Sequence, residues 1–183
     1  RGQGEPLQTL IGTTGFHSRE FKVDRGVFIP RPETELLVEA CLELLRPADH
    51  SLVAPRAAEV GCGSGVIAIS LAAEVPRLEV WATDVNAAAV ALTGQNAIRH
   101  GVAERVHVLP GDLLQPVPAS LHGALDLLVS NPPYIRRAEL AGLQREVQHD
   151  PVAALDGGED GLDVYRALCA AAPRWLRPGG WLA

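Results

Sequence analysis

The sequence predicts an α/β fold, with a doubly wound, largely parallel β-sheet that carries helices on both faces. Short apolar runs typical of buried strands alternate with stretches of helical periodicity, a pattern that requires crossover connections between parallel strands. A glycine-rich turn at residues 61–65 follows the first of these runs. With 183 residues, 47% of them hydrophobic, the chain is long enough for one domain with a sizeable core. We expect a ligand at the carboxyl ends of the strands.

The region before the sheet predicts a β-hairpin or an extended arm. From Leu7 to Phe28, short runs of strand-like composition are broken by glycines, and residues 27–29 form the last of these runs. Two prolines then end any strand and stiffen the chain. Apolar residues at helical spacing follow, so residues 33–46 are expected to form an amphipathic helix.

The rest of the chain predicts alternating strands and helices. The last helix is expected to bend or end near Pro173. Residues 178–183 form a turn followed by the start of an apolar run, so we expect the last strands to be truncated. We therefore expect an arm or linker at residues 1–32 and one domain, incomplete at its C-terminal end, at residues 33–183. The expected strands are Ala57–Val60, Leu78–Thr83, Arg105–Leu109 and Leu125–Ser130, and the expected helices are Val66–Ala73, Ala87–His100 and Leu162–Leu176.

Composition argues against several classes of protein. A net charge of -6 disfavours wholesale nucleic-acid binding, because neutralising phosphates requires a basic surface. No apolar run reaches the length of a membrane span. The three cysteines (Cys41, Cys62 and Cys169) are widely spaced, and the six histidines show no ligand spacing, so we expect neither a disulfide framework nor a metal site. A reducing, cytoplasmic setting fits best.

The glycine-rich turn Gly61-Cys62-Gly63-Ser64-Gly65 is the first candidate ligand site. Glycines allow backbone angles and close approaches that a Cβ would prevent, and a helix N-terminus just after them offers free N–H groups. The spacing is GxGxG, which differs from the GxGxxG of dinucleotide-binding folds and from a GK[ST] phosphate loop. The turn therefore indicates another nucleoside-containing cofactor, although an ordinary tight turn remains an alternative.

Acidic residues end the next two expected strands. Asp84 is placed to accept both hydroxyls of a ribose, or alternatively to cap the helix that follows. Asp112 is placed to meet an adenine amino group, or alternatively to be a solvated residue of a turn.

The segment Asn131-Pro132-Pro133-Tyr134 follows the fourth strand and is the second candidate site. The prolines force the chain out of the sheet with little freedom, so the Asn131 amide and the Pro132 carbonyl can face one small target. Two adjacent acceptors suit a planar NH2 group, and Tyr134 offers a flat wall beside it. The alternative is a rigid strand exit in which Asn131 bonds its own backbone.

These motifs, in this order, resemble the S-adenosylmethionine-dependent class I methyltransferases that modify planar nitrogen, which have a Rossmann-like sheet. The segments at residues 29–35 (IPRPETE) and 155–162 (LDGGEDGL) resemble, more specifically, the HemK/PrmC protein-(glutamine-N5) methyltransferases. These enzymes act on the GGQ motif of peptide chain release factors. Glutamine methyltransferases of ribosomal proteins share Asn131–Tyr134 but usually lack this Pro-Glu-Thr-Glu form, so the resemblance favours a release factor as the partner.

The resemblance implies S-adenosylmethionine as the cofactor and assigns roles to the motif residues. Asn131 and Pro132 would be catalytic, because their oxygens would orient the amide nitrogen. Where the family often has an aromatic residue this chain has Leu113, so stacking on an adenine is not expected there. The expected cofactor contacts are Gly61, Cys62, Gly63, Ser64, Gly65, Asp84, Asp112, Leu113 and Asn131. The expected substrate contacts are Phe28, Arg31, Asn131, Pro132, Pro133 and Tyr134.

Two functions of other classes remain open from the sequence. An adenine-N6 methyltransferase of DNA or RNA would use the same acceptor pair, but it would need a flipped base and a basic groove. A non-enzymatic cofactor-binding module would explain the glycine turn but not Asn131–Tyr134.

Overall fold

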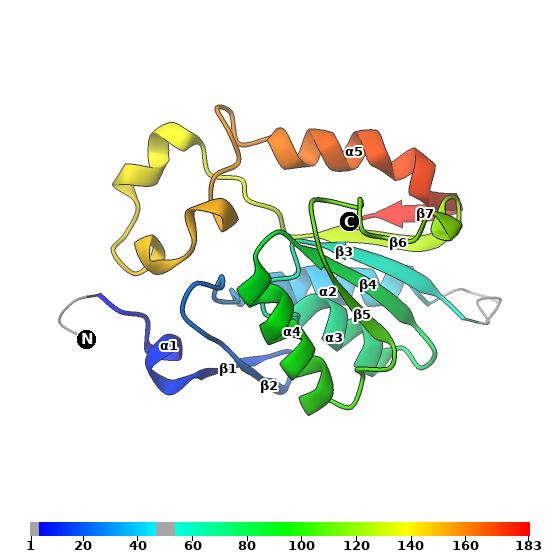
Figure 1. The fold of residues 1–183 in the computed structure, drawn as a ribbon, viewed down its shortest axis with the longest axis horizontal. Coiled ribbons are helices and arrows are strands. Elements are labelled where there is room, and N and C mark those ends of the chain that lie inside the picture. Colours follow the sequence, from blue (N-terminus) through cyan, green and yellow to red (C-terminus); the bar gives the residue numbers. More distant parts are fainter. Residues whose placement is uncertain (1–3, 47–53) are drawn as a thin grey trace.

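A computed structural model describes residues 4–46 and 54–183 of the chain. Its centre is a five-stranded sheet of order β5-β4-β3-β6-β7 in which every neighbouring pair is parallel (Figure 1). The predicted α/β fold is therefore confirmed. The strands are β3 (Arg56–Val60), β4 (Glu79–Asp84), β5 (Val106–Pro110), β6 (Leu125–Ser130) and β7 (Leu176–Leu182).

Helices cover both faces of this sheet, as the sequence predicts. The apolar core has two parts, and successive strand residues contribute to opposite parts: Ala57 packs with the first and Ala58 with the second. The first part joins the sheet to three helices and the hairpin, and the second joins it to the last helix (Figure 1). The helices are α2 (Thr34–Leu44), α3 (Val66–Glu74) and α4 (Ala87–Arg99) on the first face and α5 (Asp163–Trp175) on the second. Short 3-10 turns lie at Ala119–Leu121, Arg137–Gly142, Val147–His149 and Val152–Ala154.

The N-terminal region contains the predicted hairpin, formed by β1 (Thr13–Phe16) and β2 (Arg19–Lys22). Two expectations for this region are wrong. Residues Leu7–Ile11 form a short helix, α1, because Pro6 precedes it and Gly12 ends it in the left-handed conformation. Residues 27–29 form no strand, since the Ile29 N–H donates to the Asp150 carboxylate at 3.1 Å.

The C-terminal segment behaves as predicted at Pro173 and forms a further strand. Helix α5 ends two residues after Pro173, which lacks the N–H that would bond the carbonyl four residues earlier. The following strand, β7, then pairs with β6 through an irregular register: Leu125 pairs with Leu176, but Leu127 pairs with Trp181. Between these two pairs β7 has more residues than β6, and this surplus forms a bulge. It includes Gly179, whose φ of 78° allows the bulge.

The strand order creates a crevice at one point of the sheet. The chain leaves β3 towards β4 and β5 and returns on the other side as β6, so β3 and β6 are neighbours whose connections diverge. Ligands of open α/β sheets bind at this switch point, outside the carboxyl ends of the strands. The glycine turn after β3 and the Pro-Pro loop after β6 both lie there.

A buried amide in α4 ties the hairpin to this crevice. Asn96 is fully buried, and its Oδ1 accepts a hydrogen bond from the Lys22 N–H at 2.9 Å. Its Nδ2 donates to the carbonyls of Lys22 and Ser64 at 3.0 and 2.8 Å. One side chain therefore fixes both β2 and the glycine turn.

We expect Asn96→Ala to destabilise the fold by about 2–3 kcal/mol, because it removes three hydrogen bonds from a fully buried site. Urea unfolding measures the change, and Gln95→Ala is the control, since Gln95 is the exposed neighbour on the same helix. Equal stability of the two variants would show that the hairpin is not held through Asn96.

Candidate functional site

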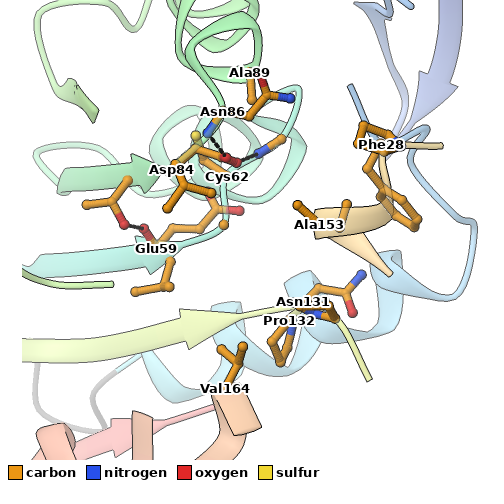
Figure 2. A pocket seen from close by; sticks show the side chains of 18 of the residues that line it. Phe28, Glu59, Cys62, Asp84, Asn86, Ala89, Asn131, Pro132, Ala153 and Val164 are labelled. Carbon is orange, nitrogen blue, oxygen red and sulfur yellow. Dashed lines mark hydrogen bonds between the residues drawn. The ribbon is translucent and has the colours of Figure 1, made fainter. Parts of the chain in front are cut away.

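A cavity opens at the carboxyl ends of the parallel strands and brings the predicted motifs together. Figure 2 shows Asp84 and Asn86 on one side of it and Asn131 and Pro132 on the other. Phe28 and Ala153 form a third side (Figure 2). The lining also includes Pro30, Thr34, Glu59, Gly61, Cys62, Gly63, Ser64, Gly111, Asp112, Leu113, Pro133, Tyr134 and Leu155.

The glycine turn after β3 needs its glycines for two different reasons. A Cβ on Gly65 would lie 2.8 Å from the side chains of Ile69 and Thr93, so only glycine lets α3 pack this close to α4. Gly61 and Gly63 are needed for their backbone conformation, because their φ values of +74° and +56° are ones that other residues rarely adopt. A Cβ at either position would meet nothing within 4 Å. The backbone of this turn therefore leaves open space at the cavity wall.

One further hydrogen bond and one buried side chain hold this turn in place. Thr93 of α4 donates from its hydroxyl to the Gly63 carbonyl at 3.0 Å. The Cys62 side chain is buried, and burial together with the nearby Glu59 carboxyl raises the pKa of its thiol. Cys62 thus packs as a neutral thiol, and nothing equips it to act as a nucleophile.

Asp84 connects the turn to the start of α4. Its Oδ2 accepts a hydrogen bond from the Gly63 N–H at 2.9 Å, and its Oδ1 accepts one from the Asn86 N–H at 2.8 Å. Asp84 does not cap α4, because Asn86 does so by accepting from the Ala88 N–H. The Asp84 carboxylate lines the cavity, and each of its oxygens keeps a lone pair for a further donor.

A second carboxyl, Glu59, lies beneath the turn. It is 1% exposed, and its Oε2 accepts a hydrogen bond from the Ala68 N–H at 2.9 Å. Burial raises the pKa of Glu59 well above its usual range, against the Ala68 hydrogen bond, and the charge of Asp84 adds to the rise. Glu59 therefore holds a proton over a pH range in which an exposed glutamate has lost it.

The Pro-Pro loop after β6 is anchored from the helix side. The Asn131 Nδ2 donates a hydrogen bond to the Thr34 hydroxyl oxygen at 3.2 Å. Thr34 is 7% exposed and stands at the start of α2. Neither Asn131 Oδ1 nor the Pro132 carbonyl accepts a hydrogen bond from any residue that the structure describes.

The glycine-rich segment 155–161 holds the exit of the same loop. The Ile135 N–H donates to the Leu155 carbonyl at 2.9 Å, and the Gly157 N–H donates back to the Ile135 carbonyl at 2.8 Å. A Cβ on Gly157 or Gly161 would lie 2.8 or 2.4 Å from the Tyr134 backbone. These glycines are thus needed because the two segments lie in backbone contact.

Asp150 fixes the arm that carries Phe28. The residue is 4% exposed, and its carboxylate accepts hydrogen bonds from the Ile29 N–H and from the Arg31 guanidinium. The same guanidinium lies 5.0 Å from the centre of the Phe28 ring. Arg31 was expected at the substrate mouth, but it is not among the described residues that line the cavity.

The remaining expected contacts lie at the rim. Asp112 is exposed and lines the cavity beside Leu113, whose carbonyl accepts from the Thr83 hydroxyl at 2.7 Å. Tyr134 lines the cavity and remains 60% exposed.

Sequence reasoning missed the residues that position the site. Thr34 lies inside the quoted Pro-Glu-Thr-Glu segment, so the motif contained it without indicating its partner. Asn96 and Asp150 carried no local signal, because their partners lie 74 and 121 residues away.

Residues 4–46 and 54–183 contain no group of three or more histidines, cysteines or acidic residues that could hold a metal ion; His50 lies outside them. No helix in that part of the chain combines the length and hydropathy that crossing a membrane requires.

The raised pKa of Glu59 predicts a pH-dependent stability. Between the unfolded value near 4.5 and the raised folded value, the folded state binds more protons than the unfolded state, so stability falls as pH rises through this range. Glu59→Gln keeps an acceptor for the Ala68 N–H and removes the titration. We expect the variant's Tm to fall less than the wild type's between about pH 4.5 and pH 8.

Thermal melts without added cofactor measure both profiles, and Glu104→Gln, at an exposed position, should follow the wild type. Parallel profiles for Glu59→Gln and the wild type would mean that Glu59 does not titrate abnormally.

The chain is similar to known methyltransferases. The model of the methyltransferase small domain family matches residues 20–150. Release factor glutamine methyltransferases of Moorella thermoacetica and Geobacter sulfurreducens are 50% and 46% identical to the chain, each over 100% of it. The chain spans only 62% and 61% of these relatives' own lengths.

Solved structures share the fold at low sequence identity. The hMettl16 catalytic domain, in complex with a MAT2A 3'UTR hairpin, matches with a TM-score of 0.64 and 15% identity, over 83% of this chain and 55% of that one. A geranyl diphosphate methyltransferase in complex with sinefungin matches with a TM-score of 0.53 and 16% identity, over 80% of this chain and 43% of that one. The family match spans the glycine turn, Asp84 and Asn131–Tyr134, and it includes well over half of the chain. The chain therefore belongs to the methyltransferase small domain family.

Proposed function

We propose that this chain is the catalytic part of an S-adenosylmethionine-dependent protein methyltransferase. Its target is the side-chain amide nitrogen (N5) of a glutamine in a peptide chain release factor. The relatives named above as release factor glutamine methyltransferases support the substrate assignment, at up to 50% identity along the whole chain. A cytoplasmic location, where release factors act, belongs to the same proposal.

The observation that carries the proposal is a pair of acceptors after β6 that take no hydrogen bond from the residues the structure describes. Asn131 Oδ1 and the Pro132 carbonyl belong to consecutive residues of a rigid loop, and both residues line the cavity. A primary amide nitrogen carries two N–H groups in one plane, so two adjacent acceptors without donors are its complement. Tyr134 and Phe28 provide flat walls for the rest of the side chain.

The opposite side of the cavity fits a nucleoside cofactor. The Ser64 hydroxyl is buried in the glycine turn and lacks a hydrogen-bond partner among the described residues. The Asp84 carboxylate keeps free lone pairs for ribose hydroxyls, and the turn leaves room beside Gly61 and Gly63. Asp112, at the rim, would meet the adenine amino group.

The proposed reaction depends mainly on positioning the amide nitrogen against the methyl group of the cofactor. S-adenosylmethionine supplies an electrophilic methyl group on a sulfonium, whereas an amide nitrogen is a poor nucleophile because its lone pair is delocalised. Asn131 Oδ1 and the Pro132 carbonyl would accept hydrogen bonds from the two amide N–H groups. These bonds would direct the nitrogen lone pair towards the cofactor side and stabilise the positive charge that develops on nitrogen. The methylated nitrogen then loses a proton readily, so the reaction requires no general base in the cavity.

Loss of the Asp84 carboxylate should weaken cofactor binding. We expect Asp84→Ala to lower the affinity for S-adenosylhomocysteine by about 1.5–3 kcal/mol, the scale of a hydrogen bond to a charged group. Calorimetry measures this affinity. Asp24 is an exposed aspartate of the arm, so Asp24→Ala is the control and should leave the affinity unchanged. Unchanged affinity in Asp84→Ala would remove Asp84 from the cofactor site.

Mass spectrometry of a release factor incubated with the full-length protein and S-adenosylmethionine tests the function itself. We expect one added methyl group on a glutamine, and we expect Asn131→Ala to lower kcat by about 10²–10³-fold, as loss of one transition-state hydrogen bond does. Asn131→Asp keeps an acceptor oxygen, so partial activity is expected.

Gln95→Ala is the control for the loss of a carboxamide that does not line the cavity. Methylation of adenine in DNA or RNA, with none on the release factor, would overturn the substrate assignment. Near-normal turnover in both Asn131 variants would place the chemistry outside this loop.

A further inference from the structure

The contact between Asn131 and Thr34 joins two segments 97 residues apart at the wall of the cavity. Thr34 is almost fully buried, and its hydroxyl oxygen accepts from Asn131 Nδ2 at 3.2 Å. Its hydroxyl makes no capping bond with α2, whose N-terminus has no side-chain cap. This hydroxyl is therefore available to act on Asn131 rather than on its own helix.

The two ends of an asparagine side chain have nearly the same shape and opposite hydrogen-bonding character. With Oδ1 towards the substrate, the loop presents two acceptors to an NH2 group; with Nδ2 towards it, donors would face donors. The Thr34 hydroxyl satisfies the Nδ2 end, and Oδ1 keeps no donor among the described residues. The oxygen is thus left for the substrate.

We propose that Thr34 is a positioning residue, which holds the Asn131 amide with its oxygen as the acceptor for the substrate nitrogen. The inference deepens the proposed function and rests on it for its effect on turnover. It also gives a physical role to the third residue of the Pro-Glu-Thr-Glu segment: α2 begins where it does so that a buried hydroxyl reaches the loop after β6.

Thr34→Val and Thr34→Ser form a matched pair for the test. Valine keeps the branched shape and removes the hydroxyl, whereas serine keeps the hydroxyl. We expect Thr34→Val to lower kcat about tenfold, the scale of one net hydrogen bond, with KM and the affinity for S-adenosylhomocysteine unchanged. Thr34→Ser should recover most of the turnover. Thr14→Val, on the hairpin and away from the cavity, should behave as the wild type.

A double-mutant cycle separates positioning from a structural role. If Thr34 acts through Asn131, then Thr34→Val should lower kcat no further in an Asn131→Ala background. A structural role would instead add its full cost in that background and would lower Tm or cofactor affinity.

The side-chain amide protons of Asn131, assigned by NMR through their loss in Asn131→Ala, give a readout that needs no substrate. Thr34→Val should shift these signals and speed their exchange with water, and Thr34→Ser should preserve them. Unchanged amide signals in Thr34→Val, or wild-type kcat in that variant, would overturn the inference. If the wild type methylates no glutamine, the proposed function fails, while the NMR result still decides whether Thr34 orients Asn131.

Discussion

The site depends on one carboxylate that joins two backbone segments. Asp84 accepts from the Gly63 N–H and from the Asn86 N–H, so the end of β4 fixes both the glycine turn after β3 and the start of α4. The Asn86 side chain then donates to the Gly26 carbonyl at 2.7 Å, which extends the same connection to the arm. Without the Asp84 carboxylate, the glycine turn and the start of α4 would lose the side chain that joins them at the carboxyl end of β4, and the arm is bonded to that start through Asn86.

The substrate side is organised by a different constraint, which is the rigidity of the loop after β6. Its prolines fix the direction of exit, the segment 155–161 lies against the Tyr134 backbone, and Thr34 occupies one end of the Asn131 amide. The arm closes the third side, because Asp150 holds Ile29 at the point where the chain turns towards α2. Contacts within the chain therefore hold each wall of the cavity, which suits a reaction that depends on positioning.

The parts of the fold and site that the sequence predicts are those encoded locally. A strand, a glycine turn and a helix follow one another within a few residues. Asp84 is the last residue of β4 and Asn131 comes directly after β6, and both strands have clear apolar runs. Thr34 and Asp150 act on partners about a hundred residues away, so no local pattern could indicate their contacts. The short helix α1 was missed for another reason: one and a half turns give too little periodicity to distinguish it from an extended run.

The proposed reaction requires the cavity to present a cofactor and a glutamine amide to each other between Asp84 and Asn131. A crystal structure of the full-length protein with S-adenosylhomocysteine and a glutamine-containing release-factor peptide tests it most directly. We expect ribose hydroxyls at the Asp84 carboxylate and the glutamine nitrogen within hydrogen-bond distance of both Asn131 Oδ1 and the Pro132 carbonyl. A cofactor bound away from Asp84, or a glutamine amide that donates to neither oxygen, would rule out this arrangement.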